Sequence, residues 1–108
     1  MIVDVEAIVG TENKRRYERY PVALVVTFEW QGAAIEARSR DISLGGMFIE
    51  CATLVPYGAE ITASVRLPAL TEIAAIPCTV RWSGGAGMGL QFGALRARET
   101  WAINQLCK

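Results

Sequence analysis

The stretch VALVVTFEWQGAAIEARSRD, residues 22–41, indicates the fold class. Residues 22–30 are rich in β-branched and aromatic side chains, which favour β-strands. Gln31 and Gly32 then predict a tight turn. Residues 33–41 alternate apolar and polar side chains with the period of a half-buried strand. We therefore expect two neighbouring strands joined by a short turn.

The same kind of pattern continues along the chain. Four further strand-like segments, separated by turns rich in glycine and proline, are residues 47–51, 60–67, 75–82 and 88–95. The last segment, residues 97–108, has apolar residues near helical spacing and predicts a helix. Short antiparallel strands in a chain of 108 residues predict an all-β fold, a small barrel or a sandwich. The C-terminal helix is expected to cover one opening or one face.

Length and composition narrow the class of protein. The chain fits one domain, which we place at residues 14–108 after a short tail at residues 1–13. Equal numbers of basic and acidic residues, 11 of each, argue against a dedicated nucleic-acid binder. The chain has no histidine and no nucleophile–base spacing, so we expect no enzyme, no cofactor and no metal site.

Cellular location is also predicted from composition. Three cysteines without metal-ligand spacing indicate reduced thiols in a cytoplasmic protein. The N-terminal residues lack the apolar run of a signal peptide, and no segment is apolar for long enough to cross a membrane. We expect no membrane insertion, and no second domain that would receive a signal.

A basic cluster precedes the first strand. Residues 14–19, KRRYER, contain four of the 11 basic side chains. Arg15 and Arg19 would be about 13 Å apart in an extended chain, on the same side. An arginine fork can donate two parallel hydrogen bonds to a phosphate, a carboxylate or a guanine edge. By itself the cluster also fits a solvated charge run.

A second motif, DISLGG, lies at residues 41–46. Asp41 and Ser43 share one face in extended geometry, and an ionised carboxylate can accept hydrogen bonds from guanine while a hydroxyl donates to phosphate. Gly45 and Gly46 would permit positive φ and the close approach of a partner. The alternative is a simple turn in which Asp41 bonds its own backbone.

Together the two motifs resemble the PilZ domain family, whose signature is RxxxR followed by [D/N]xSxxG. Arg15 and Arg19 fill the first pattern, and Asp41, Ser43 and Gly46 fill the second. Pro21, the valine-rich strand after it and residues 87–92 are also similar to the family. The resemblance covers about residues 14–107 and implies a six-stranded antiparallel barrel followed by a helix.

The resemblance also implies a ligand, the bacterial second messenger cyclic di-GMP, which carries two guanines and two phosphates. Arg15 and Arg19 would grip phosphates and guanine edges, with Arg16 as an accessory contact. The segment that carries these arginines would order around the ligand and signal to a separate protein partner, in the control of motility, secretion or surface polysaccharide.

The second motif would complete that binding site. The resemblance implies that Asp41 and Ser43 hold one guanine or its phosphate, and that Gly46 lets the turn approach. Arg81 and Trp82, on the penultimate strand, are weaker candidates for contact with a guanine. Trp82 shares its alternation with Cys78 and Val80, so it fits the core equally well.

The remaining aromatic and basic residues are assigned to structure. Trp30 and Trp101 are expected to pack in the core, and Arg38 and Arg40 to be solvated strand residues. Two other functions stay open: an adaptor that docks a partner without nucleotide, and a binder of single-stranded nucleic acid. The zero net charge counts against the latter.

Overall fold

A computed structural model describes residues 19–107. The tail at residues 1–13, Arg15, Arg16 and Lys108 lie outside the described residues. The elements are β2 (Tyr20–Pro21), β3 (Val25–Trp30), β4 (Ala33–Ile42), β5 (Gly46–Glu50), β6 (Glu60–Val65), β7 (Ala74–Gly84), β8 (Gly87–Phe92) and α3 (Ala97–Leu106). The strands and the helix lie where the sequence pattern predicts them, with the short β2 as an addition.

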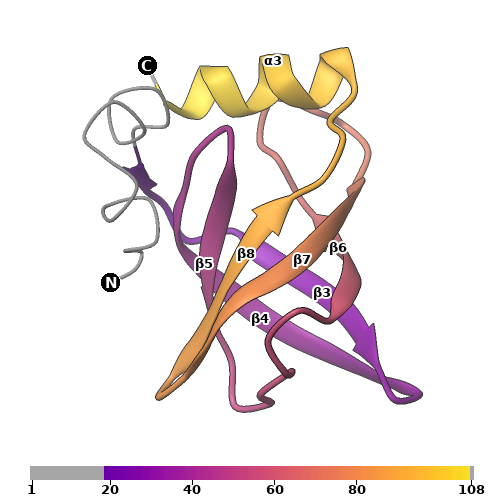
Figure 1. The fold of residues 1–108 in the computed structure, drawn as a ribbon. Helices are drawn as coiled ribbons and strands as arrows, with labels where there is room; N and C mark the ends of the chain where they lie inside the picture. Colours follow the sequence, from indigo (N-terminus) through magenta and orange to yellow (C-terminus); the bar gives the residue numbers. More distant parts are fainter. Residues whose placement is uncertain (1–18, 108) are drawn as a thin grey trace.

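Six strands close into an antiparallel barrel, which confirms the predicted fold and excludes the sandwich (Figure 1). The strands follow the order β4-β3-β6-β7-β8-β5, and β5 pairs with β4 to close the ring. β4 is long enough to pair with β3 through its first half and with β5 through its second half. The seventh strand, β2, adds to the end of β4 through Tyr20 opposite Ile42 and Pro21 opposite Asp41.

Alternating apolar residues fill the barrel. In β6 the side chains of Ile61, Ala63 and Val65 are buried, whereas Glu60 and Thr62 are exposed. The tight turn between β3 and β4 has positive φ at both Gln31 (52°) and Gly32 (82°), as a two-residue hairpin turn requires.

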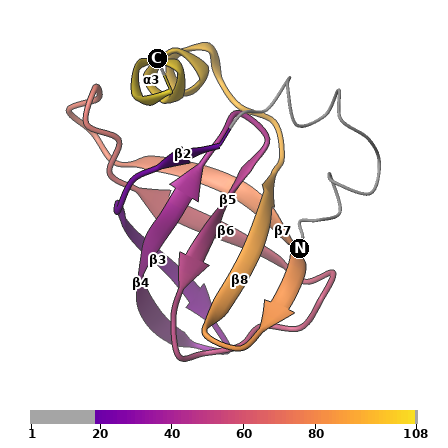
Figure 2. The same ribbon diagram turned by 90° about the vertical axis from the view of Figure 1, so that its left-hand side faces the viewer.

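α3 lies across one end of the barrel (Figures 1 and 2). Its Ala102 and Ile103 are fully buried and join the core. Trp101 lies on the opposite side of the helix and is 52% exposed, so its predicted core position is wrong. The burial of residues 102 and 103 shows that the face of the helix packed against the barrel does not include the tryptophan. Trp30 packs against the core as predicted.

Two β-bulges interrupt the alternation. The register of β4 against β5 shifts between Ser39 and Asp41, and that of β7 against β8 shifts between Val80 and Trp82. Each bulge places two successive side chains outside the barrel: Arg40 with Asp41, and Arg81 with Trp82. Trp82 is 42% exposed for this reason, so its core alternative is wrong.

The sole helix in the described part of the chain is too short and too polar to cross a membrane.

Candidate functional site

One row of residues crosses four strands on the outer wall of the barrel. The Cα partners are Asp41 on β4 with Phe48 on β5, Phe48 with Gly89 on β8, and Gly89 with Trp82 on β7. Figure 2 looks towards this wall, with β5 and β8 side by side. A carboxylate and two aromatic rings therefore share one surface, although Asp41 and Trp82 are far apart in the sequence.

Gly87 on β8 makes room for the Phe48 ring, because a β-carbon there would lie 2.8 Å from Cε1 of Phe48. Gly89, between Phe48 and Trp82, adds no side chain to the strip between the two rings. The Phe48 and Trp82 rings therefore meet above the strand, with centroids 5.5 Å apart and planes tilted by 43°. Such a tilted pair is a favourable aromatic arrangement. The two rings form an apolar platform beside Asp41.

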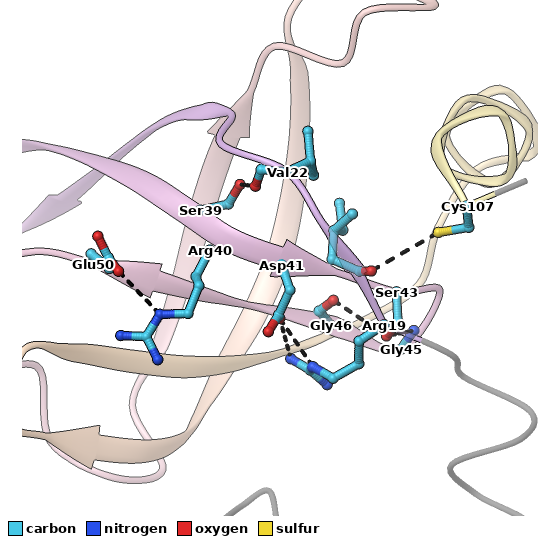
Figure 3. A network of polar contacts seen from close by, with 11 residues as sticks. Arg19, Val22, Ser39, Arg40, Asp41, Ser43, Gly45, Gly46, Glu50 and Cys107 are labelled. Carbon is cyan, nitrogen blue, oxygen red and sulfur yellow. Dashed lines mark hydrogen bonds and ion pairs between the residues drawn. The ribbon is translucent and has the colours of Figure 1, made fainter.

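An ion pair joins the two sequence motifs. Nε of Arg19 donates to Oδ1 of Asp41 at 3.0 Å, and an Nη atom of Arg19 lies 2.9 Å from the same oxygen (Figure 3). Both side chains are partly exposed, at 36% for Arg19 and 24% for Asp41. β2 positions Arg19, because its pairing with β4 brings the chain alongside Asp41. The carboxylate is thus engaged by arginine, whereas the simple-turn alternative has it bonding its own backbone.

Ser43 holds the turn that follows Asp41. Its side chain is buried; its Oγ accepts from the N–H of Gly45 at 3.1 Å and donates to the carbonyl of Gly46 at 3.4 Å. The backbone N–H of Ser43 also donates to the Gly46 carbonyl, at 2.8 Å. The Ser43 hydroxyl therefore stabilises the loop whether or not it contacts a ligand.

Gly46 serves strand packing rather than unusual backbone geometry. A β-carbon there would lie 2.1 Å from the carbonyl oxygen of Leu90, so β5 and β8 can approach only with glycine at this position. Positive φ in the described residues occurs elsewhere, at Gln31 and at four glycines, which are Gly32, Gly58, Gly84 and Gly85. Gly45 and Gly46 therefore do not use the positive φ that glycine permits.

Two more arginines flank the platform. Arg40 lies over the Phe48 ring, with its guanidinium carbon 4.4 Å from the centroid, and its Nε donates to Glu50 at 3.0 Å. Arg81 lies over the ring of Tyr57 at 5.9 Å. The two bulges explain why both arginines face outward, Arg40 next to Asp41 and Arg81 next to Trp82.

Sequence reasoning missed Phe48 and did not predict the contact of Arg40 with its ring, although Arg40 is exposed as expected. The signal for the aromatic platform was present in the outward-facing glycines at 87 and 89, which leave a strip of β8 without side chains. The sequence around Arg40 holds no comparable signal for the bulge in β4. A groove of about 820 Å³ lies on another face, lined by residues of β3, β6 and β7 that include Thr27, Glu60 and Thr79. None of the predicted site residues that the structure describes lines this groove.

The closed barrel, the helix across its end and the two motifs joined by an ion pair define a class of small β-barrel domains. The chain belongs to the PilZ domain family, whose model matches residues 13–108. No match was found among curated protein sequences.

Solved structures share this fold. The Bacillus subtilis inhibitor of motility (MotI/DgrA) is 23% identical with a TM-score of 0.73. The match covers 86% of this chain and 49% of that one, so the chain spans about half of that protein. The PilZ domain of YcgR from Escherichia coli, solved with c-di-GMP, is 14% identical with a TM-score of 0.68, over 85% of this chain and 87% of that one. The PilZ domain of CeSA from a cellulose-synthesizing bacterium is 14% identical with a TM-score of 0.63, over 82% and 93%.

Proposed function

We propose that this domain is a receptor for cyclic di-GMP that passes the signal to a protein partner in the cytoplasm. The observation that carries the proposal is the ion pair between Arg19 and Asp41, which joins the two motifs on one outer wall. The solved YcgR domain of the same fold contains this nucleotide. MotI, another structure of this fold, is described as an inhibitor of motility, which makes motility control a candidate output.

The wall offers chemistry that suits both parts of the ligand. Asp41 can accept from the N–H edge of a guanine, and Arg19 can donate to a phosphate or to the Hoogsteen edge. Phe48 and Trp82 offer ring faces on which a guanine can stack. Because Ser43 and Gly46 shape the turn, we assign them to the architecture of the site, with ligand contact by Ser43 as part of the proposal.

The rest of the basic motif belongs to the proposal as well. Arg15 and Arg16 lie outside the described residues, and we propose that they bind the phosphates and guanine edges together with Arg19. Ordering of this segment around the nucleotide would be the conformational change that a partner detects.

Calorimetric titration of the folded protein with cyclic di-GMP tests the proposal and gives affinity and stoichiometry together. We expect Arg19→Ala and Asp41→Ala each to weaken binding by more than about 1.5 kcal/mol, because each removes a charged hydrogen-bonding group. Trp82→Ala should weaken it by about 1–3 kcal/mol through lost stacking.

Two controls match these variants. Arg66→Ala removes an exposed arginine beyond the end of β6, and Trp101→Ala removes an exposed tryptophan on α3; neither should change the affinity. Absence of heat at tens of micromolar folded protein would refute nucleotide binding. Unchanged affinity of the Arg19 and Asp41 variants would refute the site.

The exposed Trp101 favours a second candidate, an adaptor that docks a partner through α3 without nucleotide. That function predicts partner capture that is insensitive to cyclic di-GMP and to Arg15→Ala, but is lost in Trp101→Ala. Capture that requires the nucleotide would exclude it.

A further inference from the structure

Arg40 lies next to the candidate site although it belongs to neither motif. The bulge in β4 turns Arg40 outward together with Asp41, and Figure 3 shows both side chains leaving β4 on the same side. Asp41 is the Cα partner of Phe48, and the Arg40 guanidinium lies over that ring. Both arginines therefore contact this cross-strand pair. Arg19 is bonded to the Asp41 carboxylate, and Arg40 lies over the Phe48 ring.

Two contacts hold the Arg40 side chain. The Phe48 ring lies 4.4 Å from its guanidinium carbon, and Oε2 of Glu50 accepts from Nε at 3.0 Å. The ring restricts the guanidinium without using its hydrogen-bond donors. Glu50 neutralises the charge, but the pair is open to solvent, with the side chains 54% and 52% exposed. Exposed ion pairs of this kind are weak in water, so a better anion can replace the carboxylate.

We propose that Arg40 is a further phosphate-binding residue of this site and that Glu50 is a built-in competitor for it. This inference rests on the proposed function. In the free protein Arg40 is paired with Glu50; in the complex its fork donates to a phosphate of the nucleotide while the Phe48 ring continues to support it. A phosphate accepts two parallel hydrogen bonds from arginine, and the ring has already limited the freedom of the side chain.

Competition between Glu50 and the phosphate for Arg40 lowers the affinity for the nucleotide. Every binding event must displace the Glu50 carboxylate from the Arg40 guanidinium, to which it is hydrogen-bonded in the free protein. Removing the charge of Glu50 therefore strengthens binding, and removing the charge of Arg40 weakens it. The effect of Glu50 acts through Arg40, so it disappears when Arg40 is absent.

Calorimetric titration with cyclic di-GMP at low and high salt tests this, using Arg40→Met, Glu50→Gln and the double variant. Methionine keeps an unbranched side chain over Phe48 without the charge. We expect Arg40→Met to weaken binding about tenfold and to make it less dependent on salt. Glu50→Gln should tighten binding about threefold, and the double variant should bind like Arg40→Met.

Glu60→Gln is the matched control, because it removes the same charge from the groove face of β6. It should leave the affinity unchanged, and circular dichroism should show all variants folded. If the wild type binds but Arg40→Met binds equally well, Arg40 has no ligand role. If Glu50→Gln tightens binding equally in the Arg40→Met background, Glu50 acts only through its overall charge. Either result overturns the inference alone, whereas absence of binding by the wild type overturns it together with the proposed function.

Discussion

Gly46 is the last fixed position of the second motif, and its immediate neighbour is the backbone of β8. Its Cα pairs with Gln91, and a β-carbon would lie 2.1 Å from the carbonyl oxygen of Leu90. A backbone atom cannot rotate away as a flexible side chain can. The glycine therefore allows β5 to pair closely with β8, and its place in the motif has a structural cause that does not depend on a ligand.

We predict that Gly46→Ala destabilises the protein by about 1–3 kcal/mol, because the strands must separate to admit the methyl group. Chemical denaturation followed by circular dichroism measures this. Gly89→Ala is the control: its β-carbon would lie 3.4 Å from the nearest atom, Cβ of Trp82, so stability should change little. If Gly46→Ala kept full stability and still lost nucleotide binding, the glycine would be a ligand contact.

At the scale of single residues, sequence reasoning predicted that Arg19 and Asp41 belong to one site. The structure joins the two side chains by an ion pair, and their role in ligand binding stays a prediction. The sequence did not point to Phe48 or to the contact of Arg40 with it, because both depend on neighbours across strands. Which residue lies opposite Phe48 depends on the register, and no local pattern encodes the register of β5 against β8.

Among the elements, α3 depends on a buried carboxylate at its first turn. Glu99 is 1% exposed; its carboxylate accepts from the backbone N–H of Arg96 at 2.9 Å and from the Arg96 guanidinium at 2.6 and 3.0 Å. Burial alone would raise the pKa of Glu99, but the hydrogen bonds from Arg96 outweigh burial and hold the pKa below its usual value. The carboxylate accepts a hydrogen bond from a backbone N–H at the start of the helix. Its negative charge also interacts favourably with the positive, N-terminal end of the helix dipole.

We predict that Glu99→Ala lowers the free energy of unfolding at pH 7 by about 1–2 kcal/mol, through loss of this cap. Because the pKa of Glu99 is lower in the folded protein, its charge stabilises the fold above the unfolded pKa of about 4.3. That contribution is lost as the pH falls through the folded pKa. The difference in stability between wild type and variant should therefore be complete at pH 7 and shrink below about pH 4.

Urea titrations at several pH values measure this difference. Glu72→Gln serves as the control, since Glu72 meets Arg98 at 3.5 Å with its side chain 74% exposed and should not affect stability. A Glu99 variant whose deficit stayed constant from pH 7 to pH 3 would show that side-chain packing, rather than the charged cap, is what Glu99 supplies.

Element boundaries were predictable because alternation and turn residues are local signals. Residues 60–67 alternate as β6 does, and Gln31-Gly32 turns the chain as expected. Strand interiors were less predictable. A bulge adds one residue to the pattern without a specific residue type, so strict alternation assigned Trp82 to the core side.

For the whole molecule, barrel closure follows from pairing between strands that are distant in sequence. β4 pairs with β3 and β5, and β5 pairs with β8, so the second motif lies where the ring closes. Loss of closure would separate Asp41 from Phe48 and Trp82 at once. Ligand binding on this wall should therefore stabilise the fold globally rather than one loop.

Cys78 offers a measure of that global stability. Its side chain lies on β7 in the core, 3% exposed, and burial raises the pKa of the thiol to about 12. The native thiol is thus both inaccessible and almost fully protonated at pH 8, and only the thiolate reacts with an alkylating agent. Cys51 and Cys107 are less buried and should react first.

We predict that Cys78 is alkylated only through global unfolding, and that cyclic di-GMP slows its alkylation by the factor 1 + [L]/Kd, about 100-fold at a ligand concentration of 100 Kd. Mass spectrometry of peptides after timed alkylation measures the rate for each cysteine. Because global unfolding exposes much surface, the Cys78 rate should rise with urea as steeply as the unfolding equilibrium does. Arg19→Ala supplies the ligand control, as the nucleotide should protect its Cys78 far less at the same concentration. A Cys78 rate that is independent of urea would instead show local separation of β6 from β7, and the site wall would then not be coupled to the stability of the whole barrel.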